Sequence, residues 1–151
     1  DATLALRSTD DGSLRIFIDG HNARVTDLAF SPDGTILASG SLDGTVRLTD
    51  IATGLKQTTI RMPDDVGVSR VAYSPGSQTA VTNPRLVVGG VNGTVWVIDV
   101  EEARIVGTLP VSATNLVSAI VALSFSQNGR SINLLSADGV FVTADLVALA
   151  V

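Results

Sequence analysis

The chain has 151 residues, of which 45% are hydrophobic and 17% charged, a composition that indicates one folded domain rather than a disordered chain. No apolar run approaches the roughly 20 residues that span a bilayer, so we expect no membrane insertion. The net charge of −5 disfavours nucleic acid as a direct ligand, because phosphates would be repelled on average. The chain has no cysteine and a single histidine, His21, which excludes disulfides and most metal sites, and we expect no cofactor.

The first predicted element is a hairpin over residues 3–18, TLALRSTDDGSLRIFI. This segment superposes on residues 45–60, so that Gly12 falls on Gly54, and residues 45–60 are the second half of a repeat that follows. The chain also begins at Asp1 without an initiator methionine. We therefore expect it to open halfway through a repeat and to be a piece of a longer protein.

The best-formed repeat begins with VTDLAFSPDGTILASGSLDGTVRLTD, residues 25–50. Its Pro-Asp-Gly and Asp-Gly turns separate alternating apolar runs, which is the sequence signature of antiparallel hairpins. The pattern predicts four strands, at residues 25–31, 36–42, 45–51 and 55–61.

Two further repeats follow with the same order of strands and turns. The second requires about six extra residues in the loop that holds residues 77–85, whose Pro and Gly content is typical of a surface loop. Its strands are predicted at residues 69–74, 86–91, 94–100 and 104–109. The third aligns without a gap and predicts strands at residues 120–126, 131–137 and 140–145, with residues 147–151 as a candidate outer strand.

The repeat length indicates the architecture. Ser8, Asp50, Asp99 and Asp145 close equivalent strands at spacings of 42, 49 and 46 residues, close to the roughly 40–45 of a four-stranded propeller blade. We predict an all-β, partial β-propeller of about three and a half antiparallel blades. Its parts are a half blade at 1–19, blades at 20–62 and 63–110, and an incomplete blade at 111–151. Because a lone sheet cannot bury both of its faces, we expect the remaining blades to come from the same or another chain.

Three short motifs resemble the WD-repeat family. Gly20-His21 is similar to its Gly-His dipeptide, FSPDG at residues 30–34 to its first turn, and GSLDGTVRLTD at residues 40–50 to its signature. Thr49-Asp50 stands where the family has Trp-Asp, and the other repeats depart further, with Arg7-Ser8, Ile98-Asp99 and Ala144-Asp145. The resemblance covers nearly the whole chain and implies a β-propeller that, as in most of the family, is a non-catalytic scaffold.

The same resemblance implies a buried structural network of His21, Asp43, the strand serine Ser41, and Thr49 in the place of the usual Trp. Ser41, His21 and Asp43 also match the residue types of a hydrolase triad. Because the chain lacks a nucleophile motif such as Gly-x-Ser-x-Gly, we favour the structural network and predict that the protein is not an enzyme.

Two places are candidate protein-binding surfaces. Trp96 occupies the position that Arg47 has in the first repeat and faces away from the neighbouring apolar residues, so the two form a candidate contact patch. The alternative is that Trp96 packs against the next blade. The insertion, with Ser77, Gln78 and Arg85, is the second candidate, because it departs most from the regular repeat. The acidic pairs Asp64-Asp65 and Glu101-Glu102 are either solvated loops or contacts for a basic partner.

These observations predict a protein–protein interaction scaffold, a subunit of a larger intracellular assembly, located in the cytoplasm, with other proteins as partners. One alternative is a propeller enzyme or ligand-binding module with a site on the central channel, although no matched acid, base or metal group supports it. The other is a nucleic-acid-associated scaffold, in which basic residues would lie on the missing blades.

Overall fold

A computed structural model describes residues 2–75, 84–109 and 118–146, and its strands are all antiparallel. The all-β partial propeller predicted from the sequence is confirmed. The elements are β1 (Leu4–Arg7), β2 (Leu14–Ile18), β3 (Val25–Phe30), β4 (Ile36–Ser41), β5 (Thr45–Asp50), β6 (Lys56–Arg61), the short 3-10 turn η1 (Pro63–Asp65), β7 (Val68–Tyr73), β8 (Arg85–Gly90), β9 (Val95–Asp99), β10 (Arg104–Leu109), β11 (Ile120–Phe125), β12 (Ser131–Ser136) and β13 (Phe141–Asp145).

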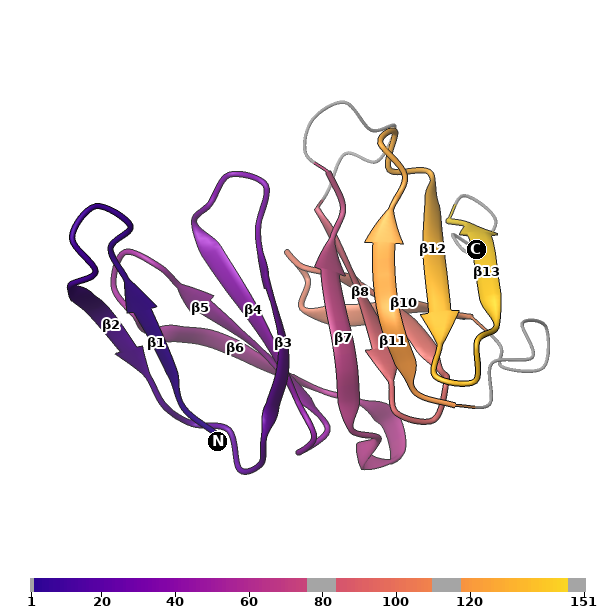
Figure 1. The fold of residues 1–151 in the computed structure, drawn as a ribbon, viewed down its shortest axis with the longest axis horizontal. Coiled ribbons are helices and arrows are strands. Elements are labelled where there is room, and N and C mark those ends of the chain that lie inside the picture. The colour runs from indigo at the N-terminus through magenta and orange to yellow at the C-terminus, as the bar shows by residue number, and fades with distance from the viewer. Residues whose placement is uncertain (1, 76–83, 110–117, 147–151) are drawn as a thin grey trace.

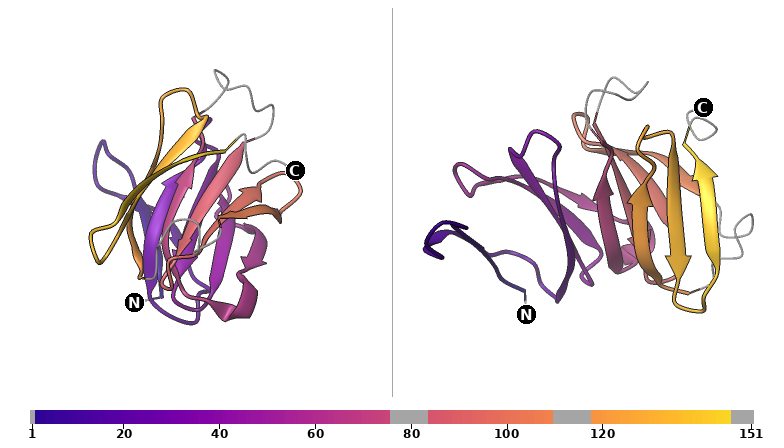
Figure 2. Two further views of the ribbon diagram at one scale, coloured as in Figure 1. Left: turned by 90° about the vertical axis from the view of Figure 1, so that its right-hand side faces the viewer. Right: turned by 45° about the horizontal axis from the view of Figure 1, so that its top comes forward.

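The strands form four sheets that follow one another along the chain. An N-terminal hairpin, β1–β2, precedes a first sheet of β3–β6, a second sheet of β7–β10 and a third sheet of β11–β13, and within each sheet the strands pair in chain order. The opening strands β3, β7 and β11 lie next to one another, while the N-terminal hairpin and the third sheet occupy opposite ends of the molecule (Figure 1). Figure 2 shows the same succession of sheets from two further sides. This is the arrangement expected of successive propeller blades.

The predicted strands and the observed ones agree to within one or two residues. Gly34 and Gly44, in the two turns of the first sheet, have φ of 73° and 76°, a left-handed backbone that favours glycine and explains why the turns stand out in the sequence. The candidate outer strand at 147–151 and residues 77–83 of the predicted loop at 77–85 lie outside the described residues, and Arg85 is the first residue of β8 rather than part of the loop.

The junctions between the first and second sheets and between the second and third sheets are apolar cores to which both neighbours contribute. In the second sheet, alternate residues point to opposite faces, as the two-residue period of a strand requires. Val88 and Trp96 pack toward the first sheet with Val46 and Leu48, whereas Val87 and Val97 join a second cluster with residues of the third sheet. The middle sheet is therefore buried on both faces, which explains why its strands are almost continuously apolar.

Hydrogen bonds between neighbouring opening strands reinforce these cores. The Thr26 hydroxyl donates to the Val68 carbonyl at 2.7 Å, and the Val71 amide donates to the Asp27 carboxylate at 2.9 Å. At the next junction the Arg70 Nε donates to the Val121 carbonyl at 2.7 Å. Thr26 and Asp27 of β3, and Arg70 of β7, thus bind the opening strand that follows.

Among the described residues, large apolar side chains are exposed at both ends of the succession of sheets. On the first sheet, Leu28 and Phe30 of β3 are 43% and 54% exposed, and Phe17 of the N-terminal hairpin is also exposed. On the third sheet Phe141 is exposed in the same way. Large apolar side chains of the described first and last sheets are therefore exposed to solvent on the faces that have no neighbouring sheet.

Shortening Leu48 to alanine tests the shared core. Leu48 is 2% exposed, and Leu48→Ala should lower the free energy of unfolding by about 2–5 kcal/mol, because it leaves a cavity in the junction. Urea unfolding followed by circular dichroism measures the change. The matched control is Leu55→Ala, in a turn of the same sheet at 70% exposure, which should change stability by less than about 0.5 kcal/mol. Equal effects of the two substitutions would contradict the proposed packing.

Candidate functional site

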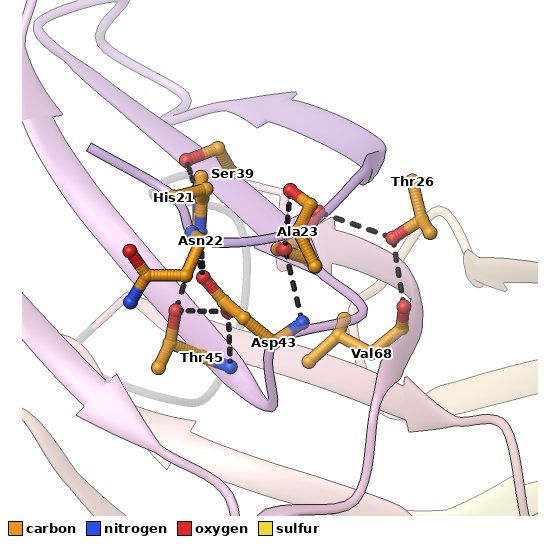
Figure 3. Close-up of polar contacts among 10 residues, drawn as sticks. His21, Asn22, Ala23, Thr26, Ser39, Asp43, Thr45 and Val68 are labelled. Atoms are coloured by element: carbon orange, nitrogen blue, oxygen red, sulfur yellow. Dashed lines mark hydrogen bonds and ion pairs between the residues drawn. The ribbon is translucent and has the colours of Figure 1, made fainter. Parts of the chain in front are cut away.

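The single histidine lies at the centre of a buried hydrogen-bond network (Figure 3). His21 precedes β3 and is buried. Its Nε2 is 2.9 Å from Ser39 Oγ in β4, and its Nδ1 is 3.1 Å from Asp43 Oδ2 in the turn between β4 and β5. The network therefore ties the segment before β3 to the middle of the first sheet.

Asp43 accepts hydrogen bonds on both of its carboxylate oxygens. Oδ2 also accepts the Asn22 amide at 2.8 Å, and Oδ1 accepts the Thr45 amide at 3.0 Å and the Thr45 hydroxyl at 2.5 Å. Burial by itself would raise the pKa of Asp43, but the hydrogen bonds from Thr45, Asn22 and His21 outweigh it and lower the pKa to about 2. The carboxylate is ionised at neutral pH.

An ionised Asp43 determines the tautomer of the histidine. Because a carboxylate can only accept, Nδ1 of a neutral His21 carries the proton that it shares with Asp43. Nε2 is then the acceptor for the Ser39 hydroxyl. All the polar atoms of the imidazole are satisfied in this arrangement, which is the requirement for a stable buried network.

The serine that bonds the histidine is Ser39, whereas the sequence pointed to Ser41. The Ser41 hydroxyl donates to the Ala23 carbonyl at 3.1 Å and accepts the Asp43 amide at 3.1 Å, so it supports the same loop without touching the imidazole. Thr49 is buried in β5 opposite Leu37, and its hydroxyl makes no hydrogen bond to His21. Strand alternation places Ser39 and Ser41 on the same face of β4, and the position of the imidazole along the strand, beside Ser39, decides between them.

Thr45 completes the network and was missed from the sequence. Its hydroxyl lies 3.2 Å from His21 Nδ1 as well as bonding Asp43. The Asp-Gly-Thr turn could have indicated Thr45, because an aspartate in a turn commonly accepts a hydrogen bond from the backbone amide two positions later. Ser39, Thr45 and His21 are all buried, and the arrangement holds the loop before β3 against the first sheet.

The other sheets keep this turn without the histidine. Asn92 Oδ1 accepts the Thr94 amide at 3.0 Å in the second sheet. In the third sheet, the Ser118 hydroxyl donates to Asp138 at 2.8 Å and thereby links the segment before β11 to the turn. A serine thus makes in the third sheet a loop-to-turn link comparable to the one that His21 makes in the first.

Trp96 is not exposed, so it does not form the candidate contact patch with Arg47. Trp96 is 3% exposed and belongs to the core between the first and second sheets, because β9 is an inner strand with a sheet on either side. It packs over Gly90, where an added Cβ would lie 2.9 Å from the indole. The alternative considered above, that Trp96 packs against another blade, holds, and that blade is the preceding first sheet rather than the next one.

The remaining candidates lie apart from one another. Arg47 is half-buried, with its guanidinium against Gly20, where a Cβ would lie 2.2 Å from Nη1. Arg85 is half-buried at the start of β8, and Ser77 and Gln78 lie outside the described residues. Arg47 and Arg85 are not brought together with Trp96 into one exposed patch.

A different exposed surface lies on the rim that carries the β4–β5 and β8–β9 turns, and we call it the turn rim. Leu42 and Val91 begin these turns and are 44% and 41% exposed. Gly67 lies between these two residues. A Cβ added to Gly67 would lie 3.4 Å from the Leu42 side chain, and the Gly67 carbonyl accepts a hydrogen bond from the Val91 amide at 2.9 Å. Asp64 and Asp65 adjoin this surface, because the Asp65 backbone packs on Gly44 of the same turn. In the sequence, the feature that could have indicated this surface is the apolar residue at the start of the Leu-Asp-Gly turn and of the Val-Asn-Gly turn.

Within the described ranges, no group of three or more His, Asp or Glu side chains is placed to hold a metal ion. The described helical segment is too short to cross a membrane.

Neutralising Asp43 tests the electrostatics of the network. The pKa of Asp43 is depressed on folding, so its ionised form stabilises the fold above about pH 4 and the contribution is lost as the pH falls through about 2. Asp43→Asn should therefore cost about 2 kcal/mol at pH 7 and much less near pH 2. Urea unfolding at pH 7, 4 and 2 measures this difference. Asp64→Asn, at an exposed carboxylate, is the control, and a pH-independent cost at Asp43 would contradict the assignment.

Known proteins share the repeat that the strands display. The family model described as "WD domain, G-beta repeat" matches residues 12–50. The WD repeat-containing protein SL1-17 of Schistosoma mansoni is 31% identical over 130 residues, which are 86% of this chain and 39% of that protein. The ribosome biogenesis protein ERB1 of Coccidioides immitis is 40% identical over 62 residues, which are 41% of this chain and 7% of that protein.

The chain thus spans well under half the length of each of these relatives. The family model coincides with the best-formed repeat, and the Schistosoma protein aligns with most of the chain. Together with the succession of antiparallel sheets and the His21–Asp43 network, these matches show that the chain belongs to the WD-repeat family.

Proposed function

We propose that this chain is a protein-interaction scaffold that binds partners through the turn rim. The observation that carries the proposal is the pair Leu42 and Val91, two apolar side chains exposed at equivalent turns of successive sheets. Adjacent exposed apolar residues with polar surroundings are typical of protein-binding surfaces. The buried network below Leu42 holds its turn in place, which lowers the entropy lost on binding.

The acidic residues beside the rim indicate the chemistry of a partner. Asp64 and Asp65 are exposed and have φ of 54° and 53°, a left-handed backbone that is uncommon for residues other than glycine. Backbone outliers of this kind concentrate at functional sites. Asp65 is paired with Arg61 at 2.7 Å, whereas Asp64 has no ion pair within the described part of the chain. A partner segment that is basic and partly apolar fits this surface best.

The relatives support a role in a multi-subunit assembly. Several of them are named ribosome biogenesis proteins, and we propose that this chain belongs to a longer propeller that works in an assembly of that kind. Such a role favours the nucleus over the cytoplasmic location predicted from the sequence. The acidic turn rim favours a protein over RNA as the direct ligand, because phosphates would be repelled.

A pair of rim substitutions tests the proposal. Leu42→Asp with Val91→Asp should reduce co-purification of cross-linked partner proteins by at least about tenfold, because both contacts become charged and desolvation becomes costly. Quantitative mass spectrometry of the tagged protein in cells measures the loss.

Leu55→Asp is the matched control, because this exposed leucine lies in the β5–β6 turn on the opposite rim. It should leave the partners unchanged. The proposal fails if the rim and control variants retain the same partners, or if RNA rather than protein is the species lost.

A further inference from the structure

Two Asn-Gly pairs stand in turns where the first sheet has Asp-Gly. Asn92-Gly93 lies in the β8–β9 turn, on the turn rim, in the place of Asp43-Gly44. Asn128-Gly129 lies in the β11–β12 turn, in the place of Asp33-Gly34. The opening strands run in the same direction and successive turns of a sheet alternate between its two ends, so the second pair lies on the opposite rim (Figure 1). Both asparagines are exposed.

An Asn-Gly pair converts to an acid with water as the only co-reactant. The backbone nitrogen of the glycine loses its proton to solvent and attacks the asparagine Cγ. The new C–N bond closes a succinimide ring, and the side-chain nitrogen takes up a proton and leaves as ammonia. Water then opens the ring to aspartate or isoaspartate, and no atom is oxidised or reduced. Glycine permits the attack because it has no Cβ to hinder the approach of its nitrogen.

The side-chain oxygens of the two asparagines are held to different extents. Within the described part of the chain, Asn92 Oδ1 accepts one hydrogen bond, from the Thr94 amide at 3.0 Å. Asn128 Oδ1 accepts two, from the Ser126 hydroxyl at 2.8 Å and from the Arg130 amide at 3.0 Å. The side chain has to turn its Cγ toward the glycine nitrogen before ring closure, and this movement breaks one hydrogen bond fewer at Asn92.

The two attacking nitrogens differ in the same direction. The Gly93 amide donates to the Gly90 carbonyl at 3.2 Å. The Gly129 amide donates to the Ser126 carbonyl at 2.9 Å, which is a shorter hydrogen bond. Because the amide has to leave its acceptor in order to react, the fold restrains the β8–β9 turn less than the β11–β12 turn at this step also.

An aspartate fits the β8–β9 turn. Asp43 has this place in the first sheet, where its carboxylate accepts both the amide and the hydroxyl of Thr45. Thr94 stands in the place of Thr45, so a carboxylate in place of the Asn92 amide can accept the same two groups. The reaction therefore produces a residue that the repeat already uses at this position.

We propose that Asn92 is a site of spontaneous deamidation, which makes the turn rim more negative as the protein ages. The new carboxylate directly follows Val91, one of the two exposed apolar residues of the rim, and adds to the charge of Asp64 and Asp65. A basic partner segment then binds more tightly. The effect on binding rests on the proposed function, whereas the reaction at Asn92 requires no partner.

Mass spectrometry of the aged protein compares the two asparagines directly. Trypsin places them in different peptides, residues 86–104 and 105–130. When the folded protein is incubated at mildly alkaline pH, Asn92 should gain the mass of an amide-to-acid conversion about threefold faster than Asn128, because one hydrogen bond fewer has to break. In urea the two rates should converge, because each asparagine then precedes a glycine that no fold restrains.

Three outcomes would overturn the assignment of Asn92. One is an equal or faster rate at Asn128 in the folded protein. Another is a difference that persists in urea, because it would then come from the neighbouring residues in the sequence. The last is absence of conversion at Asn92 in the folded protein over the time that converts the unfolded chain.

Substitutions test the effect on partners separately. Asn92→Asp reproduces the product and should raise the recovery of cross-linked partner proteins about threefold. Asn128→Asp adds the same charge on the opposite rim and should leave the recovery unchanged. Asn92→Ser is neutral and unreactive, and its hydroxyl keeps an acceptor for the Thr94 amide, so its recovery should stay constant while that of the unsubstituted protein rises with age.

Equal recovery with the two aspartate variants would overturn the effect of this charge on the turn rim. Loss of partners on Leu42→Asp with Val91→Asp bears on the proposed function alone, and retention of partners in that variant would leave the deamidation rates as they are.

Discussion

A sheet of this molecule exposes apolar side chains on both faces, and this property requires each sheet to lie between two others. Val87 and Val97 leave one face of the second sheet, while Val88 and Trp96 leave the other. No hairpin or single blade can remove both sets from water, and burial of apolar area is the dominant stabilising contribution to folding. The succession of sheets, the hydrogen bonds between opening strands and the exposed terminal faces all follow from this requirement.

The His21–Asp43 network stabilises the same architecture by attaching a connecting segment to the first sheet. The segment before β3 crosses from one sheet to the next, and such a connection has few apolar contacts of its own. A buried imidazole bonded to Ser39 and Asp43 attaches it to the first sheet. The third sheet reaches a comparable result with Ser118 and Asp138, which shows that the link, rather than the histidine itself, is what the fold needs. A rigid turn at Leu42 is the consequence for binding.

The molecule therefore presents the turn rim as a surface for partners. The turn rim is a finished surface, whose exposed residues lie on turns fixed by hydrogen bonds below them. Because these turns are held in place before binding, the turn rim suits reversible contacts with partner proteins.

The sequence by itself determined the strands, the turns and the repeat, because these depend on local chemistry: alternation of apolar residues along a strand, and Asp-Gly pairs where φ is positive. It also indicated that His21 and Asp43 belong to one network. Only the tertiary structure decided which serine bonds the histidine, that Trp96 is covered by the neighbouring sheet, and that Leu42 and Val91 lie on either side of Gly67. These outcomes depend on which face of a strand meets which neighbour, and residues far apart in the sequence set that relation.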